Sequence, residues 1–205
     1  MTWRHPSRQQ KNNTEVFYED DYPVFDASKV QDTEISVTKY RSYEAAMLLH
    51  EENPDAKIAV MNFANAFHAG GGVVIFKTDE DLPKLMPKDE WVNVDVITIA
   101  APDLRAKSNP YAVLVGDGTY MNKAELFGYH VKRAIHMLTV AAAKGADILV
   151  LGAFGCGAFE NDPEVVARAY KVALQEFPKV FKKVEFAVYC SPKDSTNYDA
   201  FRAVL

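Results

Sequence analysis

The chain has 205 residues, of which 48% are hydrophobic and 25% are charged, a globular balance that excludes disorder as the main state. This length suits a single domain with a sizeable core. The formal net charge of −5 provides no global basic field for nucleic acid, so a nucleotide-like ligand would have to be held by local backbone geometry.

The two cysteines are too few for a disulfide framework, and no Cys/His cluster has zinc spacing. The N-terminus lacks a signal-peptide core, and no apolar run is long enough to cross a bilayer. We therefore expect a reduced, cytoplasmic, soluble protein without metal, cofactor or membrane partner.

The first part of the chain is polar and aromatic by turns, and we interpret residues 1–32 as an arm packed on a domain formed by residues 33–205. The apolar pattern of residues 33–40 predicts a strand. Ser42 is then expected to cap a short helix over residues 43–52, because a serine hydroxyl can satisfy a free amide of the first helical turn.

Short continuous apolar runs predict strands that are buried on both faces. These runs lie at residues 57–64, 92–100, 147–152 and 184–190. Amphipathic helices separate the later runs. One is marked by a capping-box pattern at Asn122 and Glu125 and a stop at Gly145, and the next begins at Asp162 and Pro163. Buried strands alternating with helices predict an α/β fold whose sheet is covered on both faces.

A run of three glycines follows the strand predicted at residues 57–64. Gly70, Gly71 and Gly72 permit positive φ and have no side chains to keep a ligand away, so their amides can converge on phosphate oxygens. Asn65 offers donor and acceptor groups that suit a ribose hydroxyl pair. Ligands of open α/β sheets bind beyond the carboxyl ends of the strands, which is where this segment lies.

A second glycine-rich segment follows the strand predicted at residues 147–152 and leads into a capped helix, an arrangement that predicts a diphosphate site with the helix N-terminus behind it. The candidate binding residues are Gly152, Phe154, Gly155, Cys156, Gly157, Ala158 and Phe159. Phe159 could stack on a sugar or a base. We interpret Cys156 as small filler beside the phosphates; a nucleophilic role is the alternative, but no partner base lies nearby in the sequence. One such turn is usually only a tight turn, whereas two after buried strands favour a binding site.

These segments resemble the microbial-type poly(ADP-ribose) glycohydrolases. The resemblance rests on Asn-Phe-Ala-Asn-Ala from Asn62 together with the three glycines, on Val-Asp-Val-Ile-Thr-Ile-Ala-Ala-Pro from Val94, and on Leu-Gly-Ala-Phe-Gly-Cys-Gly-Ala-Phe-Glu-Asn-Asp-Pro from Leu151. It implies a macrodomain-like three-layer α/β/α sandwich with a mixed central sheet that binds ADP-ribose. It also implies that residues 70–72 line the diphosphate and the reactive ribose, that residues 155–157 form a second phosphate loop, and that Phe159 packs on the distal ribose.

One departure from the family concerns its catalytic acid. In the family the triple glycine is followed by Gln-Glu-Glu, whose last glutamate protonates the scissile oxygen, whereas this chain has Asp79, Glu80 and Asp81. In one alignment the triplet is a degenerate motif, and Glu80 and Asp81 are the catalytic acids. In the other, which we favour, the catalytic segment has been lost between Val74 and Ile75, and the triplet is a solvated acidic turn.

The two alignments lead to two functions. Either the protein weakly hydrolyses O-glycosidic ADP-ribose linkages, or it is a non-catalytic sensor or sequestering module for ADP-ribose or a related nucleotide signal. In both cases the resemblance implies ADP-ribose, or an ADP-ribosylated protein or polymer, as the partner, without direct nucleic-acid binding. A retired fold with a purely structural role is a third possibility, which the retained glycine block disfavours.

Overall fold

The computed structural model describes residues 14–26, 32–63, 73–105 and 122–205. Within these residues six strands form one sheet in the order β1-β6-β5-β2-β4-β3. All neighbours are parallel except β3, which pairs antiparallel with β4 at the edge of the sheet. The strands are β1 (Glu34–Thr38), β2 (Ile58–Phe63), β3 (Val73–Ile75), β4 (Val92–Ile99), β5 (Ile148–Leu151) and β6 (Lys183–Ala187). The sheet is thus mixed, which confirms the expected fold class.

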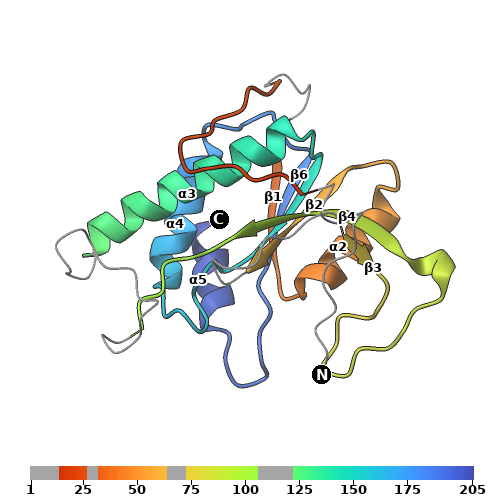
Figure 1. Ribbon diagram of the computed structural model, residues 1–205. Helices are drawn as coiled ribbons and strands as arrows, with labels where there is room; N and C mark the ends of the chain where they lie inside the picture. Colours follow the sequence, from red (N-terminus) through yellow and green to blue (C-terminus); the bar gives the residue numbers. More distant parts are fainter. Residues whose placement is uncertain (1–13, 27–31, 64–72, 106–121) are drawn as a thin grey trace.

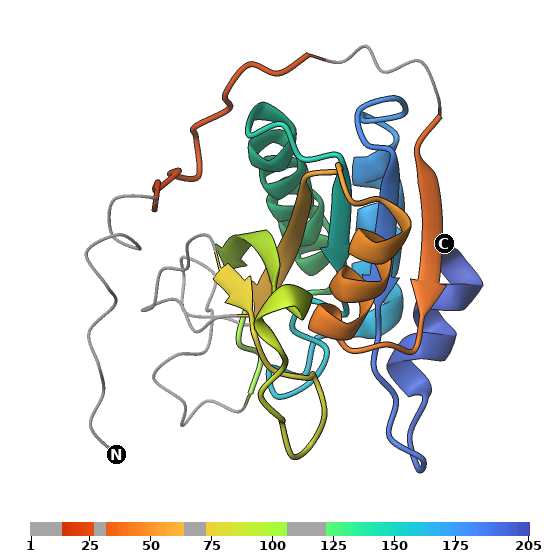
Figure 2. The same ribbon diagram turned by 90° about the vertical axis from the view of Figure 1, so that its right-hand side faces the viewer.

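Helices cover both faces of this sheet (Figures 1 and 2). Helix α2 (Ser42–Glu52) packs on one face, and α3 (Lys123–Ala143), α4 (Pro163–Leu174) and α5 (Thr196–Val204) lie on the other. The strand residues alternate between the two cores: Ile58 and Val60 pack with α2, whereas Ala59 and Met61 pack with the opposite helices. Because the central strands are buried on both faces, their sequences are continuous apolar runs.

The helix ends confirm two of the expected starts. The Asn122 side chain accepts hydrogen bonds from the amides of Ala124 and Glu125, both at 3.0 Å, and the Glu125 carboxylate accepts from the Asn122 amide at 2.8 Å. Gly145, just beyond α3, has φ +74°, a left-handed conformation that ends a helix at little cost for glycine. Asp162 caps α4 by accepting from the Glu164 amide at 3.0 Å.

Three features differ from the sequence expectations. The first helix begins one residue earlier than expected, so Arg41, and not Ser42, is its N-cap. This start is fixed by Glu44, whose carboxylate accepts from the Arg41 amide at 3.2 Å. Strand β3 was not predicted because it has only three residues, and α5 was not predicted because it buries only Tyr198 and Phe201.

The described residues of the N-terminal segment contact the face of the domain that carries α3 and α4. Phe25 stacks on Phe177 with ring centroids 5.4 Å apart, and Glu19 pairs with Lys132 of α3 at 3.2 Å. The interpretation of residues 1–32 as a separate arm stays a prediction. Among the described helices, none combines the length and the apolar character that a membrane crossing requires.

Candidate ligand-binding site

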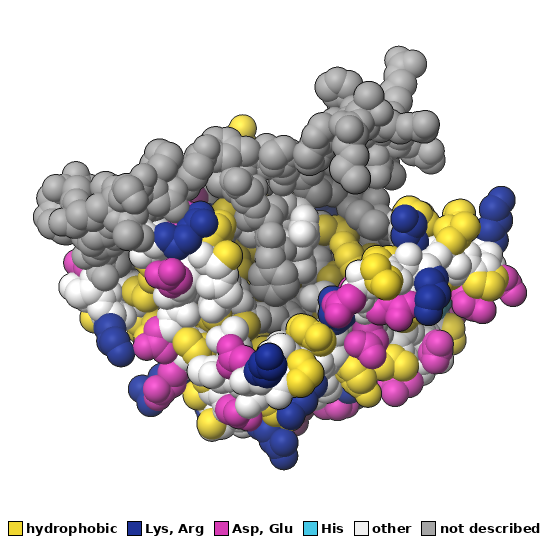
Figure 3. Space-filling view, turned by 90° about the horizontal axis from the view of Figure 1, so that it is seen from below, with side chains coloured by type: hydrophobic (Ala, Val, Ile, Leu, Met, Phe, Trp, Pro, Cys, Tyr) yellow, Lys and Arg dark blue, Asp and Glu magenta, His cyan; other side chains and the backbone are white. Residues whose placement is uncertain are grey.

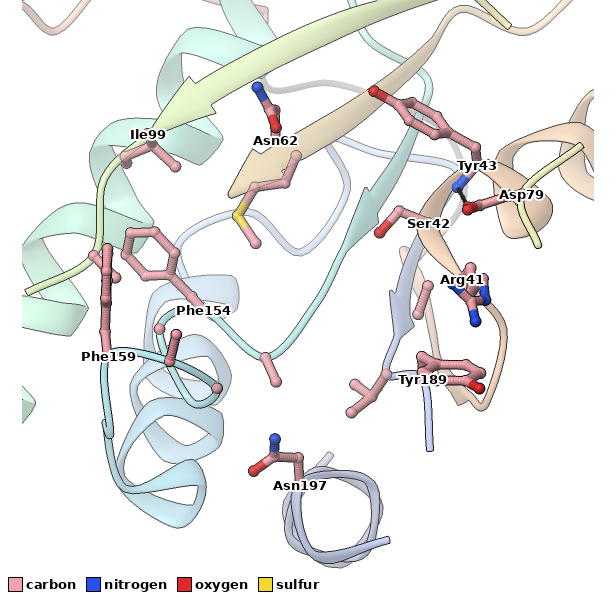
Figure 4. A pocket seen from close by; sticks show the side chains of 18 residues that line it. Arg41, Ser42, Tyr43, Asn62, Asp79, Ile99, Phe154, Phe159, Tyr189 and Asn197 are labelled. Carbon is pink, nitrogen blue, oxygen red and sulfur yellow. Dashed lines mark hydrogen bonds between the residues drawn. The ribbon is translucent and has the colours of Figure 1, made fainter. Parts of the chain in front are cut away.

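A cavity of about 600 Å³ lies at the carboxyl ends of the parallel strands, a volume typical of small-molecule sites (Figure 4). All five parallel strands contribute to it, as expected for an α/β sheet. The wall residues are Arg41, Ser42 and Tyr43 after β1, Met61 and Asn62 in β2, Ile99 and Ala101 at the end of β4, residues 153–155 and 157–159 after β5, Ala187, Val188 and Tyr189 at the end of β6, and Asp79 and Asn197.

The loop after β5 requires glycine at position 155. Gly155 has φ +76°, which side-chain-bearing residues rarely adopt. A Cβ atom at this position would lie 2.5 Å from Asn161 Nδ2 and 2.6 Å from Ala101 Cβ. At Gly157, by contrast, no described atom lies within 4 Å of the corresponding Cβ position. Gly155 is therefore required by the conformation of the loop, whereas Gly157 contributes a stretch of cavity wall that has no side chain.

The same loop offers backbone donors to the cavity. The amides of Gly157, Ala158 and Phe159 donate to no acceptor within the described part of the chain. Those of Cys156 and Glu160 are used inside the loop, on Ala153 and Gly157. Successive free amides form a concave site for an anion. The amides of Glu164 and Val165 at the start of α4 are taken by the Asp162 carboxylate, so the helix N-terminus contributes less than the sequence suggested.

Cys156 lies in this loop but does not line the cavity. Burial raises the pKa of its thiol to about 12, and Asp162 adds to the shift. The Sγ atom is 3.7 Å from the carbonyl oxygen of Phe154. A thiol that stays protonated at neutral pH is a poor nucleophile, which supports its interpretation as filler.

The opposite wall of the cavity carries the charged and aromatic groups (Figure 4). The Arg41 guanidinium lies 4.2 Å from the centroid of the Tyr189 ring and also pairs with Asp81. Desolvation lowers the pKa of Arg41, but hydrogen bonds to Asp81 and Tyr189 outweigh it and raise the pKa overall. Asp79 Oδ2 accepts from the Tyr43 amide at 2.9 Å and lines the same wall.

The acidic turn divides into one residue that lines the cavity and two that do not. Asp79 is a wall residue, whereas Glu80 and Asp81 are not among the wall residues. The Glu80 carboxylate accepts from the Thr78 hydroxyl at 2.9 Å and lies 3.4 Å from Lys84. Hydrogen bonds from these two residues lower the pKa of Glu80. The catalytic role of Glu80 and Asp81 stays a prediction.

The structure brings together only part of the predicted binding set. Phe154, Gly155, Gly157, Ala158 and Phe159 line the cavity, whereas the buried Gly152 and the partly buried Cys156 do not. The other four predicted residues, Asn65, Gly70, Gly71 and Gly72, lie outside the described residues.

Sequence reasoning missed the wall formed by Arg41, Tyr43, Asp79, Tyr189 and Asn197. The rule that found the glycine loop could have found Arg41 and Tyr43, because they follow the carboxyl end of the strand predicted at residues 33–40, and Tyr189 lies at the carboxyl end of the strand predicted at residues 184–190.

Seen from the carboxyl ends of the strands, the face around the site carries side chains of both charges, interspersed with hydrophobic ones (Figure 3). No patch of one sign dominates the described side chains on this face. An anionic ligand would therefore be bound by local groups and not by a broad positive field, as the net charge indicated.

Residues 4–76 match the family model of the microbial-type PARG catalytic domain. No curated protein matches the chain. Among solved structures, poly(ADP-ribose) glycohydrolase from Deinococcus radiodurans in complex with ADP-ribose aligns with a TM-score of 0.68 and 27% identity over 84% of each chain. The enzyme from Thermomonospora curvata aligns with a TM-score of 0.70 and 24% identity over 87% of this chain and 78% of that one. These comparisons confirm that the chain is similar to the microbial-type poly(ADP-ribose) glycohydrolases, in sequence over residues 4–76 and in fold over most of its length.

Proposed function

We propose that the cavity binds ADP-ribose, free or as the terminal unit of an ADP-ribosylated protein or polymer. The observation that carries this proposal is the run of three amides on the cavity wall, at Gly157, Ala158 and Phe159, that have no acceptor in the described part of the chain. Three adjacent donors suit the oxygens of a diphosphate, which needs several hydrogen bonds when water is displaced. The similarity to an enzyme that was crystallised with ADP-ribose supports the same ligand.

The two walls suit different parts of this ligand. With the diphosphate on the loop amides, the Phe159 ring is placed to pack on a ribose, as the family resemblance implies. The Tyr189 ring, already stacked with Arg41, presents a flat surface to a planar base. As the family resemblance implies, this proposal assigns the diphosphate and the reactive ribose to residues 70–72 as well, which lie outside the described residues.

We further propose that binding, and not efficient hydrolysis, is the main activity. A general acid must carry a proton near neutral pH, and the lowered pKa of Glu80 keeps its carboxyl ionised there. The exposed Asp81 is paired with Arg41. These features support the solvated-turn alignment. Weak hydrolysis of an O-glycosidic linkage is the second candidate, and the observation that favours it is Asp79 on the cavity wall.

The proposal is tested by isothermal titration with ADP-ribose, AMP and ribose 5-phosphate. Phe159→Ala should weaken binding of ADP-ribose, because it removes an aromatic surface from the cavity. Arg168→Ala is the matched control, since Arg168 is exposed on α4, pairs with Glu164 along its helix and does not line the cavity. Micromolar or tighter binding of ADP-ribose by the wild type, with weaker binding of both fragments, supports the proposal. An absence of heat for ADP-ribose at high concentration contradicts it.

A further inference from the structure

A buried asparagine lies directly beneath the glycine loop. Asn161 is 2% exposed. Its Nδ2 donates to the carbonyl oxygens of Pro102 at 2.8 Å, Gly155 at 3.0 Å and Phe159 at 3.3 Å. Its own backbone amide also donates to Gly155 at 3.1 Å. One side chain thus joins the segment after β4 to both ends of the loop after β5.

These hydrogen bonds decide which backbone groups face the ligand. Carbonyl oxygens carry partial negative charge and would repel a diphosphate if they were turned toward the cavity. The bonds to Asn161 hold the carbonyl of Gly155 under the loop, and together with the Leu104 amide at 3.0 Å they hold that of Phe159. Among the described residues, the amides of residues 157–159 have no acceptor. The asparagine therefore favours a loop that presents donors.

The orientation of the Asn161 amide is set by a histidine. His130 Nε2 lies 2.9 Å from Asn161 Oδ1, and His130 is 2% exposed within α3. Because Nδ2 is engaged with three carbonyls, the oxygen must face the imidazole, and Nε2 must be the donor. The edge of the His130 ring also packs against Phe154, with centroids 5.8 Å apart. A flipped amide would bring its NH₂ group against the imidazole donor and its oxygen against the carbonyls.

We propose that Asn161 is the positioning residue of the phosphate-binding loop and that His130 fixes the orientation of its amide. This inference rests on the proposed function only in taking a diphosphate as the ligand of the loop. Neither side chain touches the ligand. Both act through the carbonyl groups of Gly155 and Phe159.

Two pairs of variants separate positioning from stability. Asn161→Leu removes the donor at similar volume, and Asn161→Asp keeps the oxygen facing His130 but turns a carboxylate toward the carbonyls. Each should weaken ADP-ribose binding by roughly tenfold or more, because the carbonyls of Pro102, Gly155 and Phe159 each lose the Asn161 side-chain donor and the loop rearranges. His130→Leu should weaken binding as well, whereas His130→Gln, which can still donate to Asn161 Oδ1, should restore affinity to within about threefold of wild type.

Leu49→Ala is the matched control, since Leu49 is buried in the core around α2 and its loss lowers stability without contact to the loop. Affinities are measured by titration at a temperature at which every variant is folded. Backbone amide chemical shifts of residues 157–159 are recorded in the free proteins. The inference predicts shifted loop amides in Asn161→Leu and unchanged ones in Leu49→Ala.

The outcomes are distinguishable. Wild-type affinity in Asn161→Leu, or equal losses in Asn161→Leu and Leu49→Ala, overturns the positioning role. Should Asn161→Leu not fold, the His130 pair decides: equal affinity in His130→Leu and His130→Gln overturns the inference, and rescue by glutamine supports it. If the wild type does not bind ADP-ribose, the proposed function fails, and the amide shifts alone decide whether Asn161 holds the loop.

Discussion

Arg41 and Tyr189 form a stacked pair on the cavity wall, with the guanidinium carbon 4.2 Å from the ring centroid. Arg41 follows β1 and Tyr189 follows β6, and these strands are neighbours in the sheet. The stack therefore depends on the pairing of strands from opposite ends of the sequence. Because Arg41 also pairs with Asp81, the pair presents an aromatic ring and a partly compensated positive charge to a nucleotide.

Arg41→Ala should weaken ADP-ribose binding by roughly three- to thirty-fold, the range for loss of a cation–π contact. The fold should be unaffected, because only the backbone of Arg41 takes part in the start of α2. Titration of this variant against Arg168→Ala, which removes the same charge from an exposed site, measures the effect. Equal affinities in the two variants would show that the stack does not contact the ligand.

Gly155→Ala should lower the free energy of unfolding by about 2–5 kcal/mol, because φ is positive there and the new Cβ atom would overlap Asn161 and Ala101. For a chain of this size the melting temperature should fall by roughly 5–15 °C. Gly157→Ala should leave it nearly unchanged, since no atom of the described residues lies within 4 Å of the added Cβ. Thermal unfolding followed by circular dichroism compares the two, and similar melting temperatures would mean that position 155 tolerates a side chain.

Cys156 should react slowly with thiol reagents in the native protein. With a pKa of about 12, only about one thiol in ten thousand is ionised at pH 8. Iodoacetamide labelling followed by mass spectrometry of peptides should show Cys190 modified before Cys156, because the pKa of the Cys156 thiol is raised to about 12. Denatured protein, in which both cysteines react, is the control. Rapid labelling of Cys156 at neutral pH would reopen the nucleophile hypothesis.

Poly(ADP-ribose) incubated with the protein should yield little or no free ADP-ribose, and Glu80→Gln and Asp81→Asn should leave that yield unchanged. The reason is that Glu80 is already ionised and that neither residue lines the cavity. Chromatography of the product after long incubation is the measurement. Asp79→Asn tests the remaining acid of the turn. A yield that falls in Glu80→Gln or Asp81→Asn would instead support the degenerate-motif alignment.

The sequence predicted the elements whose signals are local. Apolar runs identified the long strands, and the capping residues Asn122 and Asp162 identified two helix starts. The site was only half predicted, because its second wall depends on tertiary contacts. Asp79 lines the cavity because its segment folds back at the bridge between Lys77 and Leu85. No local sequence pattern predicts this bridge. The hydrogen bond between Asn161 and His130 could not be predicted from the sequence either, because a buried bond between a loop and a helix has no periodic sequence pattern.

The Asn161–His130 pair should make stability depend on pH in a defined window. Burial lowers the pKa of His130 below its ordinary value of 6.5, and the nearby Arg133 lowers it further, although the hydrogen bond to Asn161 acts in the opposite direction. Below pH 6.5 the unfolded chain therefore binds a proton at this position that the folded protein does not, so the free energy of unfolding falls as the pH falls. The slope is at most about 1.4 kcal/mol per pH unit for one proton. Urea unfolding between pH 7.5 and about pH 5 measures it, and His130→Gln should remove this component. An equal acid dependence in both proteins would show that His130 is not the group that titrates.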